Sequence, residues 1–280
     1  MTVIEAHQLT RHFDGLTAVD GLSFSVGAGE IVGLLGANGA GKTTTMRMLL
    51  GLLAPSSGTA TLLDQPVLSA DRLLMGYVPQ GLGLYRDLTV SENIRFVAEA
   101  FGVDPPSLET SGLSHVADRR IGEIPLGTRR QVAFVAARCH NPPVLILDEP
   151  TSGVGPLGRA RLWETIHRSA ESGTAILVST HHMEEAEECD RVVVMAAGRE
   201  VVSGSVSEIV GGAWSVAVIG EVEAGAFERV RDEGGTVLVD GRGWRVVGLD
   251  ASAVSAAAGP GATVSVVPAS FEETFVSLSR

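Results

Sequence analysis

Short stretches that are apolar at nearly every position mark the strands at the centre of this chain. Residues 144–147, Val-Leu-Ile-Leu, and residues 174–179, Thr-Ala-Ile-Leu-Val-Ser, have the pattern of parallel strands buried on both faces. Residues 30–35 form a third buried strand before a glycine-rich loop. Apolar residues recur at helical spacing between and around these strands, in segments 44–53, 129–140 and 157–172. Buried strands that alternate with amphipathic helices predict an α/β fold.

Less regular patterns predict the elements around this centre. Segments 3–6 and 18–26 read as short strands, the second folded around a turn at Gly21. Thr89-Val90-Ser91-Glu92 is a capping box, and it predicts a helix that ends at Gly102. Further elements are expected as strands at 59–63 and 76–80, a helix at 113–120, an acidic helix with a solvated face at 183–188, and a hairpin across Ala197-Gly198.

The pattern changes near residue 211. Beyond it, strand and helix signals follow in the order β-α-β-β-α-β, which is the split βαβ arrangement. A last amphipathic helix is expected at 271–278. We therefore predict a large domain at 1–211 and a small α+β domain, with ferredoxin-like topology, at 212–280.

The loop after strand 30–35 carries the most specific motif. Gly36-Ala37-Asn38-Gly39-Ala40-Gly41-Lys42-Thr43 matches the phosphate-binding loop in all four fixed places, and it lies between a predicted strand and helix. Small residues let backbone N–H groups close round phosphates, and the helix N-terminus adds partial positive charge. Lys42 can pair with phosphate oxygens, and the Thr43 hydroxyl can ligand Mg²⁺. The predicted nucleoside triphosphate site comprises Gly36, Asn38, Gly39, Ala40, Gly41, Lys42, Thr43 and Thr44.

Two adjacent acids, Asp148 and Glu149, follow the buried strand at 144–147. An exposed pair of solvated acids would not need such a strand before it. Asp148 can hold Mg²⁺ through a water, and Glu149 can orient the attacking water or take its proton. These residues predict metal-assisted hydrolysis of the triphosphate.

Each of three other residues has both a purely structural and a functional interpretation. Phe13 could cap a sheet edge, or it could offer a flat surface for a purine base. Gln80 follows a strand that ends at Pro79, and could be a solvated loop residue or a metal contact. His181, after strand 174–179, could be a surface group or a hydrogen-bond donor to a γ-phosphate.

Composition limits the class of protein. The formal net charge of −12, from 21 basic and 33 acidic residues, argues against a nucleic-acid partner. No apolar run approaches the roughly 18 residues of a membrane span, and the N-terminus lacks the pattern of a signal peptide. Cys139 and Cys189 fall in predicted helices and are expected to be free thiols. The expected location is the cytosol, with membrane association only through a protein partner.

Together these residues resemble the ATP-binding subunit of an ABC transporter, in the drug- and lipid-exporting branch whose membrane subunits are separate chains. The resemblance spans about residues 3–210 and includes the phosphate loop, Gly-Tyr-Val-Pro-Gln80, Leu-Ile-Leu-Asp148-Glu149-Pro-Thr-Ser-Gly and Ser-Thr-His181. It implies a mixed-sheet core with an antiparallel β subdomain and a helical subdomain, and it implies ATP and Mg²⁺ as ligands. It also implies adenine stacking for Phe13, Mg²⁺ and membrane-subunit sensing for Gln80, and a γ-phosphate switch at His181.

The sequence departs from the family pattern at two loops. The family's Leu-Ser-Gly-Gly signature is replaced by Ile124-Pro125-Leu126-Gly127, which loses a hydroxyl and a backbone N–H at Pro125 and gains bulk at Leu126. Gly155 stands where the family has aspartate. In the family, two ATP-binding domains pack head to tail, and each nucleotide lies between one phosphate loop and the other chain's signature.

The resemblance therefore implies two kinds of partner at the cytoplasmic face of the membrane: transmembrane permease subunits and a second ATP-binding subunit. A different chain with an intact signature suits the second role better than another copy of this one. The expected function is ATP hydrolysis that powers export of a small molecule or lipid, with one degenerate nucleotide site. The alternative is a regulatory nucleotide-binding subunit that hydrolyses little ATP itself.

Overall fold

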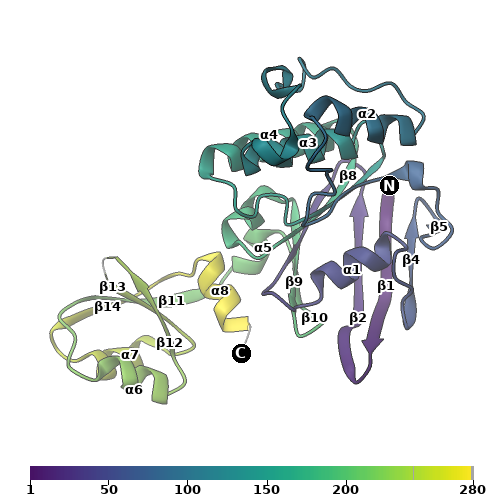
Figure 1. Cartoon of the computed structure of the whole chain (residues 1–280). Helices are drawn as coiled ribbons and strands as arrows, with labels where there is room; N and C mark the ends of the chain where they lie inside the picture. The colour runs from purple at the N-terminus through teal and green to yellow at the C-terminus, as the bar shows by residue number, and fades with distance from the viewer. Residues whose placement is uncertain (242, 279–280) are drawn as a thin grey trace. The chain divides into compact units, whose positions relative to one another are not determined.

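The computed structural model describes residues 1–241 and 243–278 (Figure 1). The chain divides into two compact units, Met1–Glu200 and Val201–Arg280. This division falls earlier than the sequence-based boundary at residue 211. The second unit contains a short helix that was not expected from the sequence, α5 (Val206–Val210), which begins with a capping box of Ser205 and Glu208.

The core of the first unit is built on a six-stranded sheet in the order β10-β9-β3-β8-β7-β6, whose edge strand β10 crosses the boundary between the units. Strands β9, β3, β8, β7 and β6 pair in this order, and each pair is parallel. Every residue of β3, β7 and β8 is buried, as their continuous apolar sequences predict. The strands are β3 (Ile31–Leu35), β6 (Met75–Val78), β7 (Val144–Asp148), β8 (Ala175–Thr180), β9 (Arg191–Ala196) and β10 (Arg199–Gly204).

A second, antiparallel sheet has the order β2-β1-β4-β5. The expected turn at Gly21 was wrong, because β2 runs straight through this residue. Gly21 has a φ of 65° and lies where the pairing with β1 shifts register, so the extra residue is taken up as a bulge. The strands are β1 (Thr2–Phe13), β2 (Leu16–Gly27), β4 (Ser57–Leu62) and β5 (Gln65–Pro66).

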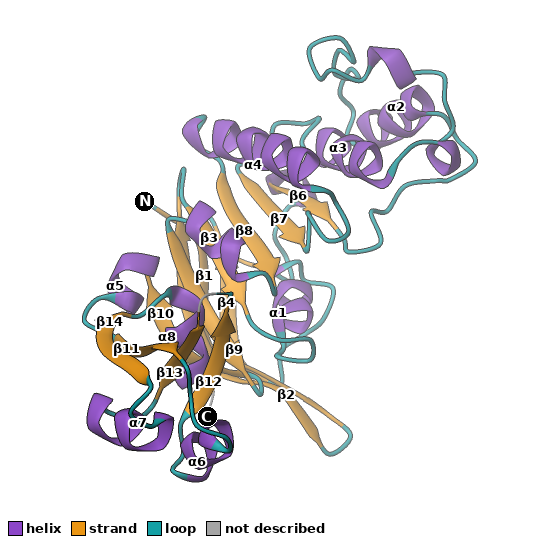
Figure 2. Cartoon of the chain, turned by 90° about the vertical axis from the view of Figure 1, so that its left-hand side faces the viewer, coloured by secondary structure: helices purple, strands orange, loops and turns teal. Residues whose placement is uncertain are grey.

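Four helices complete the first unit. Buried residues of α1 (Lys42–Leu49) belong to one apolar core with residues of both sheets, among them Ile4, Leu22, Ile146 and Leu177. Figure 2 shows α3 (Leu126–Ala137) and α4 (Pro156–Glu171) beside the six-stranded sheet, with α2 (Val90–Ala100) beyond them. The predicted capping box starts α2, where Thr89 and Glu92 bond each other's backbone N–H groups.

Two predicted helices take other forms. Segment 113–120 contains only a 3₁₀ turn, η2 (Ser114–Val116), followed by η3 (Ile121–Glu123). The acidic segment is the 3₁₀ helix η4 (Met183–Glu188), and its face is not wholly solvated, since Glu185 is only 1% exposed. Both cysteines are free, but they lie just after α3 and η4 rather than inside helices. Burial raises the pKa of Cys189 well above its ordinary value.

The second unit contains a four-stranded antiparallel sheet in the order β12-β13-β11-β14. Strand β13 lies between β11 and β12, which is the order of a split βαβ unit. Val216, Val218 and Val246 pack with helix residues Val230 and Val254 in its core. The elements are β11 (Trp214–Gly220), α6 (Ala226–Asp232), β12 (Thr236–Asp240), β13 (Gly243–Val247), α7 (Ala251–Ala258), β14 (Ala262–Pro268) and α8 (Phe271–Leu278).

The predicted fold class, an α/β core with an antiparallel subdomain, a helical subdomain and a small α+β part, is confirmed. Within the described residues, no helix combines the length and the apolar character that crossing a membrane requires.

Candidate functional site

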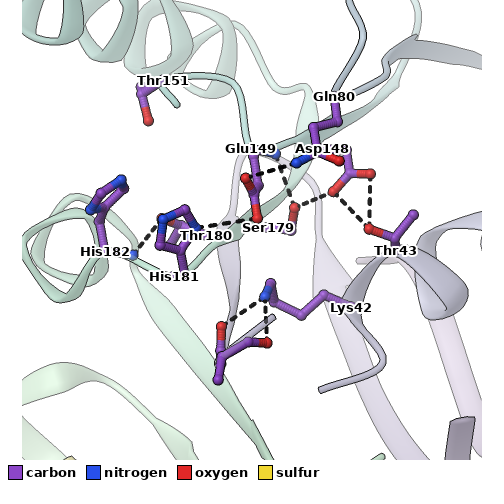
Figure 3. A network of polar contacts seen from close by, with 12 residues as sticks. Lys42, Thr43, Gln80, Asp148, Glu149, Thr151, Ser179, Thr180, His181 and His182 are labelled. Carbon is purple, nitrogen blue, oxygen red and sulfur yellow. Dashed lines mark hydrogen bonds and ion pairs between the residues drawn. The ribbon is translucent and has the colours of Figure 1, made fainter. Parts of the chain in front are cut away.

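The candidate site is built at the carboxyl ends of four parallel strands. The register pairs Leu35 of β3 with Thr180 of β8, and Ser179 of β8 with Asp148 of β7. Because these strands end at the same edge of the sheet, the residues that follow them are brought together. Figure 3 shows the result: the phosphate loop, Gln80, the acid pair and His181 come from separate segments and face one another.

Glycines give the phosphate loop a path that other residues could not follow. Gly41 has a φ of 103°, and a Cβ there would stand 2.5 Å from the carbonyl oxygen of Ala18. A Cβ on Gly36 would meet the carbonyl oxygen of Met195 at 2.4 Å. The loop can adopt this conformation because these two residues have no side chain. Its backbone continues directly into the N-terminus of α1.

Lys42 is buried inside this loop. Its Nζ donates to the carbonyl oxygens of Gly36 and Ala37, at 2.7 and 3.0 Å. Burial lowers the pKa of Lys42, and the nearby charges of Glu149 and Asp148 act in the opposite direction. No carboxylate lies within ion-pair distance of its Nζ among the described residues. The cation is thus fixed in place by carbonyl groups, and an arriving phosphate can still pair with it.

A cavity of about 560 Å³ opens beside the loop. Phe13, 41% exposed, lies on its wall at the end of β1, and Arg11 covers the ring with its guanidinium carbon 4.7 Å from the centroid. The cavity is large enough to accept a nucleotide, and both Phe13 and the phosphate loop line it. The lining includes Phe13, Asn38, Gly39, Gly41, Lys42, Thr43, Thr44, Gln80 and Glu149.

Asp148 and Thr43 form the part of the site that suits a divalent cation. The Thr43 hydroxyl donates to the two carboxylate oxygens of Asp148 at 3.3 and 3.1 Å. Asp148 is buried and also accepts a 2.5 Å bond from the Ser179 hydroxyl. A hydroxyl and a carboxylate next to a phosphate site are the oxygen ligands that Mg²⁺ prefers, so the donor set fits the predicted metal.

Glu149 lies between Gln80 and His181. Its Oε2 accepts from Gln80 Nε2 and its Oε1 faces His181 Nδ1, each at 3.2 Å. Its φ is 49°, in the left-handed region, which costs a residue other than glycine about 1–2 kcal/mol. The structure thus holds the carboxylate that could act on water in a conformation that other groups must stabilise.

The remaining predicted residues surround this centre. The Gly36 amide donates to the carbonyl of Thr180, just before His181, at 3.3 Å. Ala40 is buried in the loop, and its carbonyl accepts from the Gly198 amide at 3.2 Å. Every residue predicted from the sequence for this site therefore lies in or next to one arrangement.

This arrangement has close relatives. A family model described as ABC transporter matches residues 19–152. The Nod factor export ATP-binding protein I of Paraburkholderia xenovorans is 41% identical over 219 residues, which are 74% of this chain and 72% of that protein. The chain belongs to the ABC transporter family. A further relative of this ABC chain, a probable multidrug ABC transporter ATP-binding protein of Escherichia coli, YbhF, is 40% identical over 74% of this chain. The ABC chain spans 38% of that protein's length.

Solved ABC structures have the same fold. An ATP-binding subunit of an ABC transporter aligns with a TM-score of 0.68 at 29% identity, over 74% of this chain and 91% of that one. The cbiO1 protein of Clostridium perfringens, part of the cbiONQ ABC transporter complex, aligns with a TM-score of 0.67 at 26% identity, over 75% and 91%.

The loop at 124–127 of this ABC chain starts α3. Pro125 is the N-cap residue and supplies no side-chain acceptor, so the first amides of α3 lack a side-chain cap. Leu126 packs on the loop after Glu149: a Cβ on Gly153 would come within 2.9 Å of Leu126 Cδ2. The two loops that depart from the family pattern are thus in contact with each other.

Two residues of the ABC site were missed from the sequence. Ser179 was predicted only as the end of a strand, yet its hydroxyl donates to Asp148 and accepts from the Glu149 amide at 3.0 Å. Arg130, in the middle of a helix, donates to the Glu149 carbonyl at 2.7 Å. The parallel register of β7 and β8 could have suggested Ser179, since it is the residue paired with Asp148.

We expect Ser179→Ala to lower the free energy of unfolding by about 1–3 kcal/mol, because a buried carboxylate oxygen of Asp148 keeps only the longer bond from Thr43 and the Glu149 amide loses its hydroxyl acceptor. Chemical denaturation measures the change. Ser172→Ala is the matched control: its exposed hydroxyl bonds only the Arg168 carbonyl, and removing it should cost about 0.5 kcal/mol or less. Equal effects of the two substitutions would contradict the role given to Ser179.

Proposed function

We propose that this chain binds ATP with Mg²⁺, hydrolyses it, and thereby powers export of a small molecule or lipid through separate transmembrane subunits. The observation that carries the proposal is the position of Glu149, between Gln80 and His181 and one residue after the buried Asp148. Relatives named for multidrug transport and Nod factor export support the direction of transport.

Each group in the site has a task in this reaction. The phosphate loop and Lys42 hold the β- and γ-phosphates, and the purine base stacks on Phe13. Thr43, Asp148 and the amide oxygen of Gln80 would hold Mg²⁺, which when bound neutralises charge on the phosphates. Glu149 orients the attacking water and accepts its proton, and His181 donates a hydrogen bond to the γ-phosphate.

We expect Glu149→Gln to lower the turnover of ATP by about 10²–10⁴-fold, since a neutral amide cannot accept the proton. ATP affinity should stay within about twofold, because Lys42 and the phosphate loop are unchanged. Phosphate release by the purified transporter complex measures the turnover. Glu164→Gln is the matched control, an exposed glutamate on α4, and should leave turnover unchanged. Unchanged turnover with Glu149→Gln would instead support the regulatory role.

The altered loop at 124–127 bears on the partner. In a head-to-tail homodimer, both nucleotides would face Pro125 and Leu126 instead of a serine and a glycine. Loss of one such donor to a transition state costs about 3–4 kcal/mol in the barrier. A second, different ATP-binding chain with a complete signature would leave the site on this chain's phosphate loop fast and the other slow. We therefore propose a heteromeric pair.

We expect the double substitution Pro125→Ser with Leu126→Gly to raise ATP turnover of the homodimer by about a hundredfold, because it restores a hydroxyl, a backbone N–H and close backbone approach. Turnover per chain, measured with permease but without a second ATP-binding chain, tests this. Adding Glu149→Gln to the repaired chain should abolish the gain. A brisk, symmetric wild-type homodimer would overturn the proposal of a degenerate site.

An apolar pocket gives the permease subunits a place to bind at the cytoplasmic face of the membrane. It measures about 270 Å³ and lies next to Gln80, at the exit of β6. Its lining is mainly apolar, with Leu52 65% exposed at its edge. We propose that an apolar segment of the permease docks here, because motion of Pro79 would then reach Gln80 directly. The lining includes Leu52, Pro79, Leu82, Leu84, Val97 and Phe101.

We expect Leu52→Asp to release the chain from its permease, because a charge at this edge would be desolvated by an apolar partner. Co-purification with the membrane subunits should fall by about tenfold or more. Ile219→Asp, at another exposed apolar position in the second unit, is the control and should not change it. Retention of Leu52→Asp in the complex would exclude this pocket as the docking site.

A further inference from the structure

The backbone of Glu149 needs support from its surroundings. This residue is buried, and its φ of 49° is unfavourable for a side chain with a Cβ. Gln80 and His181 each contact one carboxylate oxygen, but contacts at the end of a side chain do not fix the peptide groups. The direction of the carboxylate therefore depends on whatever holds the amide and the carbonyl of Glu149.

Three residues hold these peptide groups. The amide of Glu149 donates to the Ser179 hydroxyl at 3.0 Å and to the Ser179 carbonyl at 3.2 Å. The carbonyl of Glu149 accepts from Nη1 of Arg130 at 2.7 Å and, within its own loop, from the Ser152 amide at 3.2 Å. Ser179 belongs to the neighbouring strand β8, whereas Arg130 reaches the same residue from α3. The Glu149 carbonyl is thus fixed by a side chain from outside the sheet.

Arg130 is an unusual residue in this position. It is only 5% exposed, and among the described residues it forms no ion pair. Its Nε is buried without a hydrogen-bond partner, and within the described part of the chain the guanidinium donates one hydrogen bond, to the carbonyl of Glu149. Burial lowers the pKa of Arg130, while the charges of Glu149 and Glu185 favour its charged form. An apolar side chain of similar length would fill this space with less loss of hydration.

We propose that Arg130 is a positioning residue for Glu149. Its bond to the Glu149 carbonyl stabilises the left-handed backbone and thereby fixes the carboxylate between Gln80 and His181, where it meets the attacking water. This inference rests on the proposed role of Glu149 in hydrolysis. It also links that role to α3, because Arg130 lies one helical turn after Leu126, at the start of the helix. A shift of the 124–127 loop would reach Glu149 through this bond.

The test compares substitutions of two arginines, Arg130 within α3 and Arg138 at its C-cap. We expect Arg130→Met to lower the turnover of ATP by about ten- to hundredfold, the range set by losing a buried charge-assisted hydrogen bond. The affinity for ATP should change by less than about twofold, because the phosphate loop keeps its contacts. Arg138→Met is the matched control: Arg138 is partly buried over the Phe134 ring and has no contact with the site. It should leave both quantities unchanged.

Two further variants separate positioning from general damage to the fold. Arg130→Lys keeps a cationic donor and should restore part of the turnover lost in Arg130→Met. In a chain that already carries Glu149→Gln, Arg130→Met should cause no further loss, because both changes act on the same group. The melting temperature of each variant is measured beside its turnover in the purified transporter complex.

The outcomes distinguish this inference from the proposed function. If Glu149→Gln keeps full turnover, the proposed hydrolysis itself fails. If Glu149→Gln is inactive but Arg130→Met turns over ATP normally, Arg130 does not position it. A loss with Arg130→Met that raises the KM for ATP, persists beside Glu149→Gln, or follows only the melting temperature would equally overturn the positioning role.

Discussion

The parallel register of β3, β8, β7 and β6 is the constraint on which the whole site depends. Leu35 pairs with Thr180, Asp148 with Ser179, and Val78 with Leu147, so four strands end level with one another. Every group assigned to phosphate, metal or water lies at one of those ends or in the segment that directly follows it, whereas Phe13, assigned to the purine base, lies at the end of β1. A slip of one residue between two strands would turn Asp148 or Ser179 to the opposite face of the sheet and separate the pair. The burial of both faces of the sheet prevents such a slip. A shifted strand would move some apolar residues out of the core and bring polar residues into their places.

Within this frame, and among the described residues, Lys42, Asp148 and Glu149 contact other groups and do not pair with one another. Lys42 is held by two backbone carbonyls, Asp148 by two hydroxyl groups, and the Glu149 carboxylate by Gln80 and His181. A direct ion pair between Lys42 and either acid would be strong in a buried site, and a triphosphate would have to break it before binding. Carbonyl and hydroxyl groups bind Lys42 and Asp148 less strongly than an ion pair would. Phosphate or water can therefore replace these groups. The arrangement therefore favours a site that is ordered in advance and still open to a polyanion.

A feature of this site could be predicted from the sequence when the residues that cause it lie close together along the chain. The buried strands, and the positions of the glycine loop and the acid pair at their ends, could be predicted because their signals are local: continuous apolar runs, glycine spacing, and charge directly after a strand. The bulge at Gly21 was mistaken for a turn, since its cause is the pairing with β1. The acidic segment 183–188 was assigned to solvent because charge pattern alone does not reveal that Thr151 donates a hydrogen bond to Glu185. Arg130 was missed for the same reason: it looks like any helix arginine until α3 is packed against Glu149.

The two departures from the family pattern differ in their physical origin. Gly153 has a φ of 75°, which favours glycine, and a Cβ at this position would come within 2.9 Å of Leu126 Cδ2. Gly155 is not constrained in this way. Its φ is −65°, nothing lies within 4 Å of the Cβ that an aspartate would add, and it is the N-cap of α4, where aspartate would stabilise the helix by roughly a few tenths of a kcal/mol over glycine. Local stability therefore favours an aspartate at this position, and sterics permit it. Among the described residues, nothing in the surroundings of Gly155 therefore requires a glycine, whereas the φ of Gly153 does favour one.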